Sequence, residues 1–330
     1  MKPAKKLAQN LIVAVLALII LSLILEISLR IHHRLRHGIS FFKRIDEAIA
    51  DPQLGWRGKR IWGDLSTKKF KIFIVGDSYT EGCCGLKEEE LYYNVIKNKL
   101  EVELFIYGAG GYGTLQEYLI IDRFIDQIKP DLVLLQVCSN DFIDNVWLLE
   151  SASFINCHYM VKPYYENGRI EYRYPRGPIL LRRYLTFYSR LVYLILERID
   201  MFLAELAKRR IIQTVEFKIE GGADLEQFRQ SVLVTSELLE KIKSRCGRDL
   251  LIAFLVNDIE PYFSRFKLMF KKFGIEFVEE IPRVIRNAEM QGNKLRLPDG
   301  GHWNKDGNRI CGEYLAKYIK SHILTRASNN

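Results

Sequence analysis

The chain has 330 residues, of which 48% are hydrophobic, enough for one large or two modest domains with a buried core and not typical of a disordered chain. Its net charge of +9 is unevenly distributed, because residues 1–44 hold eight Lys or Arg and one Glu. The rest of the chain keeps 41 of the 49 basic and 39 of the 40 acidic residues, and is therefore close to neutral. This balance argues against a basic groove for nucleic acid.

An apolar segment lies at the N-terminus. Residues 7–25, LAQNLIVAVLALIILSLIL, carry no charge, and at about 1.5 Å per residue a helix over residues 7–29 is just long enough to cross a hydrocarbon core of roughly 30 Å. A cleaved signal peptide is the alternative, because three lysines precede the run, but no small-x-small cleavage site follows it. We therefore expect a single-pass membrane anchor over residues 1–32. Basic residues lie on both sides of the span and more of them follow it, so strict charge counting would place the body inside. We nevertheless expect an extracytoplasmic body, because large domains behind one N-terminal span are commonly translocated regardless of such charges.

A predicted strand ends at a candidate nucleophile. Residues 33–69 are expected to form a connector, because Pro52 and Gly55 break any helix there. Residues 70–75, FKIFIV, form a short β-rich run that predicts a buried strand, and Gly-Asp-Ser follows it at 76–78. In open parallel α/β sheets, ligands bind beyond the carboxyl ends of the strands, so Ser78 is a candidate nucleophile. The same tripeptide also suits a turn and a helix N-cap, so on its own it is weak evidence.

The rest of the chain alternates between predicted strands and helices. Strands are expected at residues 103–107, 132–137, 249–256 and 275–278, and helices at 89–100, 114–128, 225–244, 262–273 and 310–323. This order implies parallel strands with right-handed crossovers. The alternation breaks at about residues 145–224, which we interpret as an insertion. Within it, residues 159–174 predict a hairpin that turns at Asn167-Gly168, and residues 178–210 predict helices that either face the core or lie on a membrane.

Three further motifs follow Gly-Asp-Ser along the chain: GAGGYGT at residues 108–114, CSND at 138–141 and DGGH at 299–302. With these blocks the chain resembles the SGNH hydrolases, also called GDSL lipases and esterases, whose four blocks carry Ser, Gly, Asn and His in that order. The resemblance spans roughly residues 70–323. It implies a three-layer α/β/α sandwich with a mostly parallel five-stranded sheet, in a domain over residues 70–330 that includes the insertion. It implies no cofactor and no metal.

The motifs supply a candidate for each group that ester cleavage by serine needs. His302 can act as the base, since a neutral imidazole accepts a proton near pH 7. Asp299 lies three residues earlier across two glycines, so its carboxylate can bend back to the imidazole Nδ1. By resemblance, the oxyanion hole consists of the N–H groups of Ser78 and Gly111 and the side chain of Asn140. Alternatively, the glycines only permit a tight turn and Asn140 only caps a helix.

The sequence therefore predicts an esterase that forms an acyl-enzyme on Ser78. The resemblance allows both deacetylases and O-acetyltransferases of cell-surface polysaccharides, and the anchor favours a glycan or lipid ester as substrate. The alternative from another class is a non-catalytic binding or assembly component of a membrane polysaccharide system. The sequence does not predict an oligomeric state.

Two positions depart from the family pattern, and the cysteines do not form a recognisable site. Cys138 stands where the third block commonly has glycine, and Ile106 stands where the second commonly has asparagine. Both changes alter the groups that could form hydrogen bonds around the oxyanion hole. The six cysteines lack the Cys-x-x-Cys spacing of a zinc or redox site, and most are expected to be buried apolar side chains. Adjacent Cys83 and Cys84 lie near the nucleophile and serve either in packing or as a redox switch.

Overall fold

The computed structural model describes residues 2–37, 40–42, 50–82, 86–153, 160–173, 188–209, 211, 213–247 and 251–324. The chain forms two compact units. One consists of Met1–Asp51 and Gly177–Ile212, and the other of Pro52–Arg176 and Gln213–Asn330. Part of the predicted insertion therefore groups with the N-terminal segment and not with the α/β unit.

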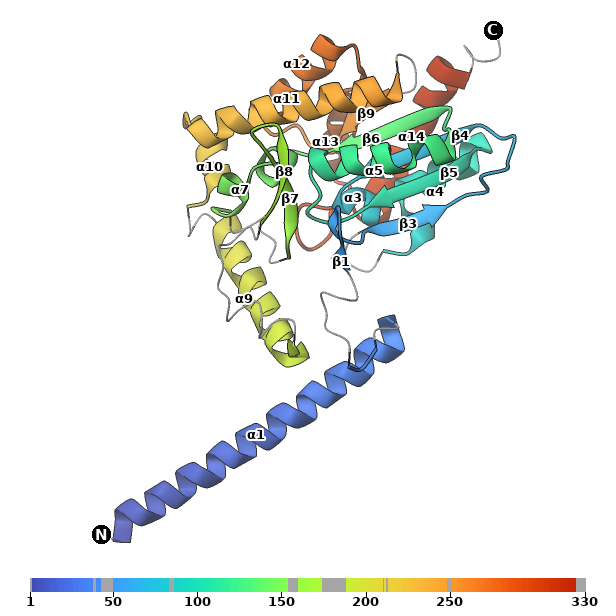
Figure 1. The fold of residues 1–330 in the computed structure, drawn as a ribbon. Helices are drawn as coiled ribbons and strands as arrows, with labels where there is room; N and C mark the ends of the chain where they lie inside the picture. Colours follow the sequence, from blue (N-terminus) through green and yellow to red (C-terminus); the bar gives the residue numbers. More distant parts are fainter. Residues whose placement is uncertain are drawn as a thin grey trace. The chain divides into compact units, whose positions relative to one another are not determined.

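The larger unit is built on a six-stranded sheet with the strand order β10-β9-β6-β4-β5-β3 (Figure 1). Five of its strands pair in parallel and coincide with the five predicted strands, which confirms the predicted fold class. The run from Ile72 to Val75 is fully buried, as expected for a central strand. The parallel strands are β4 (Lys71–Gly76), β5 (Glu103–Gly108), β6 (Leu132–Val137), β9 (Leu251–Leu255) and β10 (Glu276–Val278).

The sixth strand was not predicted. β3 (Lys59–Trp62) lies in the stretch interpreted as a connector and pairs antiparallel with β5 at the edge of the sheet. It has only four residues, two of them basic, and such short charged strands are common at sheet edges, where they leave little hydrophobic pattern. Its last residue holds it in place, since the Trp62 ring packs edge-on against Phe105 with the centroids 5.6 Å apart.

Helices cover both faces of the sheet and complete the three-layer sandwich (Figure 1). One face carries α5 (Thr114–Ile128), α11 (Glu226–Cys246) and α12 (Tyr262–Phe273), and the other carries α4 (Tyr92–Leu100), α13 (Ile281–Met290) and α14 (Lys305–Ile319). Alternate residues of β4 point to opposite layers, and Ile72 and Ile74 share one buried cluster with Tyr92 and Leu315.

Local signals in the sequence account for the helical spacing of α12 and for the start of α14. In α12, Phe266, Met269 and Phe270 are buried at helical spacing, as predicted for 262–273. The last helix, α14, begins five residues before the predicted start, because the side chain of Asn304 caps it by accepting the N–H groups of Asp306 at 2.9 Å and Gly307 at 3.1 Å. The polar residues of its first turn concealed this start in the sequence.

The predicted hairpin is confirmed and lies in the larger unit. β7 (Lys162–Glu166) pairs antiparallel with β8 (Arg169–Arg173), and the turn residues Asn167 and Gly168 have φ angles of 50° and 75°. The remaining short elements of this unit are β2 (Gly55–Trp56), α3 (Ser78–Glu81), a 3₁₀ turn (Glu88–Glu90), α6 (Asp141–Asp144), α7 (Trp147–Glu150), α10 (Val215–Glu220) and a π-helical turn (Lys320–Leu324).

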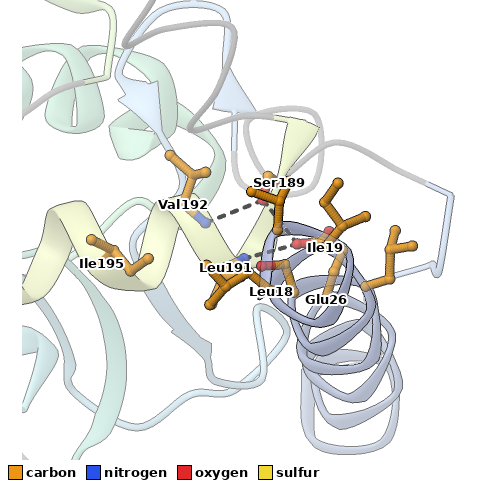
Figure 2. Close-up of a pocket in the computed structure, with 10 residues that line it drawn as sticks. Leu18, Ile19, Glu26, Ser189, Leu191, Val192 and Ile195 are labelled. Carbon is orange, nitrogen blue, oxygen red and sulfur yellow. Dashed lines mark hydrogen bonds between the residues drawn. The ribbon is translucent and has the colours of Figure 1, made fainter. Parts of the chain in front are cut away.

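The smaller unit pairs the N-terminal helix α1 (Lys2–His37) with α9 (Arg190–Lys208) and includes β1 (Ala50–Asp51). The stretch Lys5–Leu35 is long and apolar enough to cross a membrane, by length and composition alone. Glu26 of α1 caps α9, because its carboxylate accepts the N–H group of Arg190 at 3.0 Å. It also accepts the N–H group of Leu191 at 2.9 Å (Figure 2). Beside this contact lies an apolar pocket of about 570 Å³ between the two helices. Residues 178–187 of the predicted helical stretch lie outside the described residues.

The cysteines that the structure describes are Cys138, Cys246 and Cys311, and each is buried, as expected for small apolar side chains. Cys83, Cys84 and Cys157 lie outside the described residues, so the choice between packing and a redox switch for the adjacent pair stays open.

Candidate active site

Ser78 lies directly beyond the carboxyl end of β4, a central strand flanked by β5 and β6. The turn before it is tightly packed, since a Cβ at Gly76 would collide with the side chains of Gln136 and Thr80. Asp77 is fully buried, and its Oδ1 accepts the N–H of Tyr79 at 2.9 Å, while its own N–H donates to Gln136 Oε1 at 3.1 Å. These contacts support the nucleophile loop and leave the Ser78 side chain partly exposed at the rim of the sheet.

Three predicted side chains meet at this rim. His302 Nε2 lies 2.7 Å from Ser78 Oγ, and its Nδ1 lies 2.6 Å from Asp299 Oδ2. With the proton on Nδ1, the imidazole donates to Asp299, and its Nε2 is free to accept the serine hydroxyl proton. The second carboxylate oxygen of Asp299 accepts the N–H groups of Gly301 at 2.9 Å and His302 at 3.0 Å. The carboxylate thus bends back over the two glycines to the imidazole, as the spacing predicted.

These contacts also set the ionisation of Asp299. Burial opposes the charged carboxylate, but the hydrogen bonds from the His302 side chain and the Gly301 N–H outweigh burial and lower its pKa below the ordinary value. The structure therefore keeps Asp299 ionised at neutral pH, which is the state that accepts a hydrogen bond from the Nδ1–H group of His302.

Two neighbours of the histidine were not singled out from the sequence. The Tyr79 ring packs on the His302 ring with the centroids 4.9 Å apart, and its hydroxyl donates to the Gly301 carbonyl at 2.9 Å. Arg296 donates to the same carbonyl at 2.7 Å. Both side chains hold the loop that carries the histidine. Arg296 lies in no motif, so nothing in the sequence pointed to it.

The glycine turn after β5 engages one of its N–H groups internally and leaves another without an acceptor among the described residues. Gly110 donates its N–H to Glu81 Oε2 at 2.7 Å, whereas Gly111 has a φ angle of 76° and, like Ser78, donates its N–H to no acceptor within the described ranges. Ser78 and Gly111 are the two residues whose N–H groups the resemblance assigns to the oxyanion hole. Burial raises the pKa of Glu81, although the Gly110 N–H favours its charged form.

Asn140 lies at the start of α6, but its side chain makes no capping hydrogen bond to that helix. Its Nδ2 instead donates to Asp144 Oδ2 at 2.6 Å. The alternative interpretation of Asn140 as a helix cap is therefore not supported by its contacts. An amide with one N–H engaged in this way keeps its second N–H for another acceptor.

Both residues that depart from the family pattern are buried. Cys138 is buried beside Asn257, whose Nδ2 donates to Cys138 Sγ at 3.3 Å and to Ser139 Oγ at 3.1 Å. Burial raises the pKa of the Cys138 thiol well above its ordinary value, so it stays protonated. Ile106 is buried in β5 among the apolar side chains of the core.

A buried cation lies behind the site and was not predicted. Lys162, from the hairpin, is fully buried and donates from Nζ to the Gly111 carbonyl at 2.9 Å, to Asp144 Oδ1 at 3.1 Å and to Glu150 Oε2 at 2.6 Å. Burial disfavours the ammonium, but the two carboxylates outweigh burial and raise the pKa of Lys162. One lysine among several in the insertion carries no motif, so the sequence offered no signal for it.

The model of the family described as GDSL-like lipase/acylhydrolase matches residues 72–315, well over half of the chain. No curated protein matches the sequence.

Among solved structures, a lipase/acylhydrolase from Enterococcus faecalis is 13% identical with a TM-score of 0.43, and the match covers 76% of this chain and 96% of that one. A family 3 carbohydrate esterase from Clostridium thermocellum is 14% identical with a TM-score of 0.42, covering 80% and 100%. The acetylxylan esterase Axe2 from Geobacillus stearothermophilus is 12% identical with a TM-score of 0.41, covering 79% and 96%. On the extent of the family-model match, the chain belongs to the family of GDSL-like lipases and acylhydrolases and is a hydrolase that acts on ester bonds.

Proposed function

We propose that the protein cleaves its ester through an acyl-enzyme on Ser78, with His302 as the base and Asp299 as the group that orients it. The observation that carries this proposal is the continuous pair of short contacts, 2.7 Å from Ser78 Oγ to Nε2 and 2.6 Å from Nδ1 to Asp299. A serine hydroxyl is a weak nucleophile by itself, and an adjacent oriented base is what activates it.

The reaction proceeds in two halves. Ser78 Oγ attacks the carbonyl carbon while His302 Nε2 takes the hydroxyl proton, and the imidazolium then returns that proton to the leaving alkoxide as the carbon–oxygen bond breaks. Water attacks the acyl-enzyme in the same way and releases the acid. The N–H groups of Ser78 and Gly111 and the Asn140 amide would stabilise the negative oxygen of each tetrahedral intermediate.

We further propose that the substrate is an acyl ester of a surface glycan or a lipid, held near the membrane by α1. A retained anchor is favoured over a cleaved signal peptide because Glu26 has a structural partner elsewhere in the chain. Its carboxylate accepts both N–H groups at the start of α9 and the hydroxyl of Ser189 at 2.9 Å, and Arg30 donates to it at 2.6 Å. Removal of α1 would leave that helix start without its cap.

Intact mass and fractionation test the anchor. The retained full-length chain should stay with membranes after washing with alkaline carbonate, and the body of an extracytoplasmic enzyme should be digested by protease added to intact cells. A shortened chain in the soluble fraction would contradict the anchor, and a body protected until the cells are lysed would contradict the topology. Neither result bears on the ester chemistry.

Ester hydrolysis by the detergent-solubilised full chain tests the function. With p-nitrophenyl acetate, Ser78→Ala and His302→Ala should each lower kcat by about 10³-fold or more, while Ser151→Ala, a serine outside the site, should leave it unchanged. The non-catalytic alternative would be favoured by three results together. The wild type would be no faster than Ser78→Ala on p-nitrophenyl acetate, it would be no faster on esters with longer acyl chains, and a fluorophosphonate would not label it. Release of free acid at full rate distinguishes a hydrolase from an O-acetyltransferase, which should hydrolyse slowly and acylate a glycan hydroxyl.

A further inference from the structure

We propose that Lys162 is a positioning residue that holds the oxyanion hole in place by tying together its glycine and its asparagine. This inference rests on the proposed function, because it assigns a role to Lys162 only if an oxyanion forms at Ser78. Lys162 lies outside the four motifs, at the start of β7 in the insertion.

The first tie runs to the glycine turn. Lys162 Nζ donates to the carbonyl of Gly111 at 2.9 Å, and the N–H of Tyr112 donates to the Ala109 carbonyl at 3.1 Å to close the turn. Gly111 has a φ angle of 76° and no side chain, so its two peptide groups are held by contacts with neighbouring groups and not by a side chain of its own. The buried ammonium restrains the carbonyl on one side of Gly111 and thereby the direction of the N–H on the other.

The second tie runs to the asparagine. Asp144 uses Oδ1 to accept Lys162 Nζ at 3.1 Å and Oδ2 to accept Asn140 Nδ2 at 2.6 Å. Because the carboxylate is fixed from one side by a cation, the amide that it orients is fixed as well. One side chain from the hairpin thus acts on donors from two loops, which follow β5 and β6.

The remaining contact explains how this cation tolerates burial. Glu150 Oε2 accepts the third N–H of the ammonium at 2.6 Å, so all three Nζ donors are used and Lys162 is fully buried. A charge this deep is stable only when it is paired and hydrogen-bonded. Burying the Lys162 ammonium costs free energy of desolvation. An apolar residue at this position would pack the hairpin against the core without that cost, so packing alone does not account for the lysine.

Replacing the carbonyl oxygen of the substrate ester by sulfur tests the proposal independently of how much protein is folded. A thiono ester carries C=S where the ordinary ester carries C=O, and sulfur accepts hydrogen bonds poorly, so an intact oxyanion hole favours the oxygen ester strongly. Loss of folded enzyme lowers both rates equally. Loss of oxyanion geometry lowers mainly the rate on the oxygen ester, and the ratio of the two rates falls.

The variants are Lys162→Met, Asp144→Asn and, as a matched control, Tyr165→Phe. Tyr165 lies on the same strand and donates its hydroxyl to Glu237, away from the oxyanion groups. For phenyl acetate and its thiono analogue, Lys162→Met should lower the oxygen-to-sulfur rate ratio by about 10²-fold through kcat, with KM little changed. Asp144→Asn, which leaves Lys162 paired with Glu150, should lower the ratio in the same direction, and Tyr165→Phe should keep it.

The outcomes separate the two proposals. The role of Lys162 would be overturned if Lys162→Met kept the oxygen-to-sulfur rate ratio of the wild type, or if Tyr165→Phe lowered that ratio by as much. Either result would leave Ser78-dependent hydrolysis unaffected. If Lys162→Met yields too little folded protein, Asp144→Asn decides, and a wild-type ratio in that variant overturns the inference. Absence of Ser78-dependent hydrolysis in the wild type would overturn the proposed function and this inference together.

Discussion

Replacing Asp77 by asparagine should stabilise the protein at neutral and alkaline pH without abolishing its activity. Asp77 is fully buried beside Ser78, and burial raises the pKa of its carboxyl group from an ordinary 3.8 to about 6. Asparagine keeps an oxygen that accepts the Tyr79 N–H at 2.9 Å, and it cannot ionise. It therefore imitates the protonated aspartic acid at every pH.

The magnitude follows from the two pKa values. Because the folded state binds the proton more tightly than the unfolded state, wild-type stability falls as pH rises from about 4 to about 6 and the carboxyl group loses its proton. The difference between 3.8 and about 6 corresponds to about 3 kcal/mol once Asp77 is fully ionised. The advantage of Asp77→Asn should thus be near zero at pH 4, grow through the window and level off above pH 7.

Denaturant unfolding of the full chain in detergent measures this difference. Tryptophan fluorescence reports on the α/β unit, since all four tryptophans lie there, at positions 56, 62, 147 and 303. An advantage of Asp77→Asn that is the same at pH 5 and pH 8, or a loss of stability at both, would refute the reasoning. Ester hydrolysis by the variant should stay within a few-fold of the wild type, because the capping contact is kept.

Three further outcomes are expected. Asn140→Ala should lower kcat by about 10²–10³-fold with little change in KM, and a loss confined to KM would contradict its role as an oxyanion donor. Glu117 is fully buried, and its carboxyl oxygens contact no hydrogen-bond partner within the described residues. Glu117→Met should therefore raise the free energy of unfolding by about 1–3 kcal/mol. A destabilised variant would show that the carboxyl group has hydrogen-bond partners in solution. The pKa of Asp299 is lowered in the folded state, so its ionisation stabilises that state at any pH above the ordinary pKa of 3.8. This contribution is lost as the pH falls through the lower pKa of the folded state. The wild type should therefore lose more stability than Asp299→Asn on acidification, and equal acid sensitivity of the two would contradict this.

Short-range patterns in the sequence were sufficient for the alternation of strands and helices, and the likeness of the four motifs to a hydrolase family indicated the three residues that meet at the rim. The runs that became β4 and β6 are short and mostly apolar, with one polar residue each, Lys71 and Gln136, and such local patterns depend little on the rest of the chain. Asp299 and His302 are three residues apart, so their contact at 2.6 Å is also a local property. That Ser78 meets them follows from the parallel order of the strands, which places loops from distant motifs at one edge.

Edge and boundary elements were harder to predict. β3 is short and partly exposed, and its pairing with β5 depends on a free sheet edge that no local pattern records. The predicted start of α14 was too late because its first turn is polar, and the capping contacts of Asn304 establish the observed start.

What the sequence alone determined was therefore the order of the core strands, the likeness of the four motifs to a hydrolase family, and the candidate triad. Only the tertiary structure decided which glycine N–H is engaged, through Glu81 and Gly110, and that Lys162 reaches Gly111 across 51 positions of the chain. The physical reason is that periodicity and spacing record interactions between near neighbours in sequence. A buried ion pair or a hydrogen bond between distant loops depends on how the whole core packs, and leaves no periodic trace in the residues that form it.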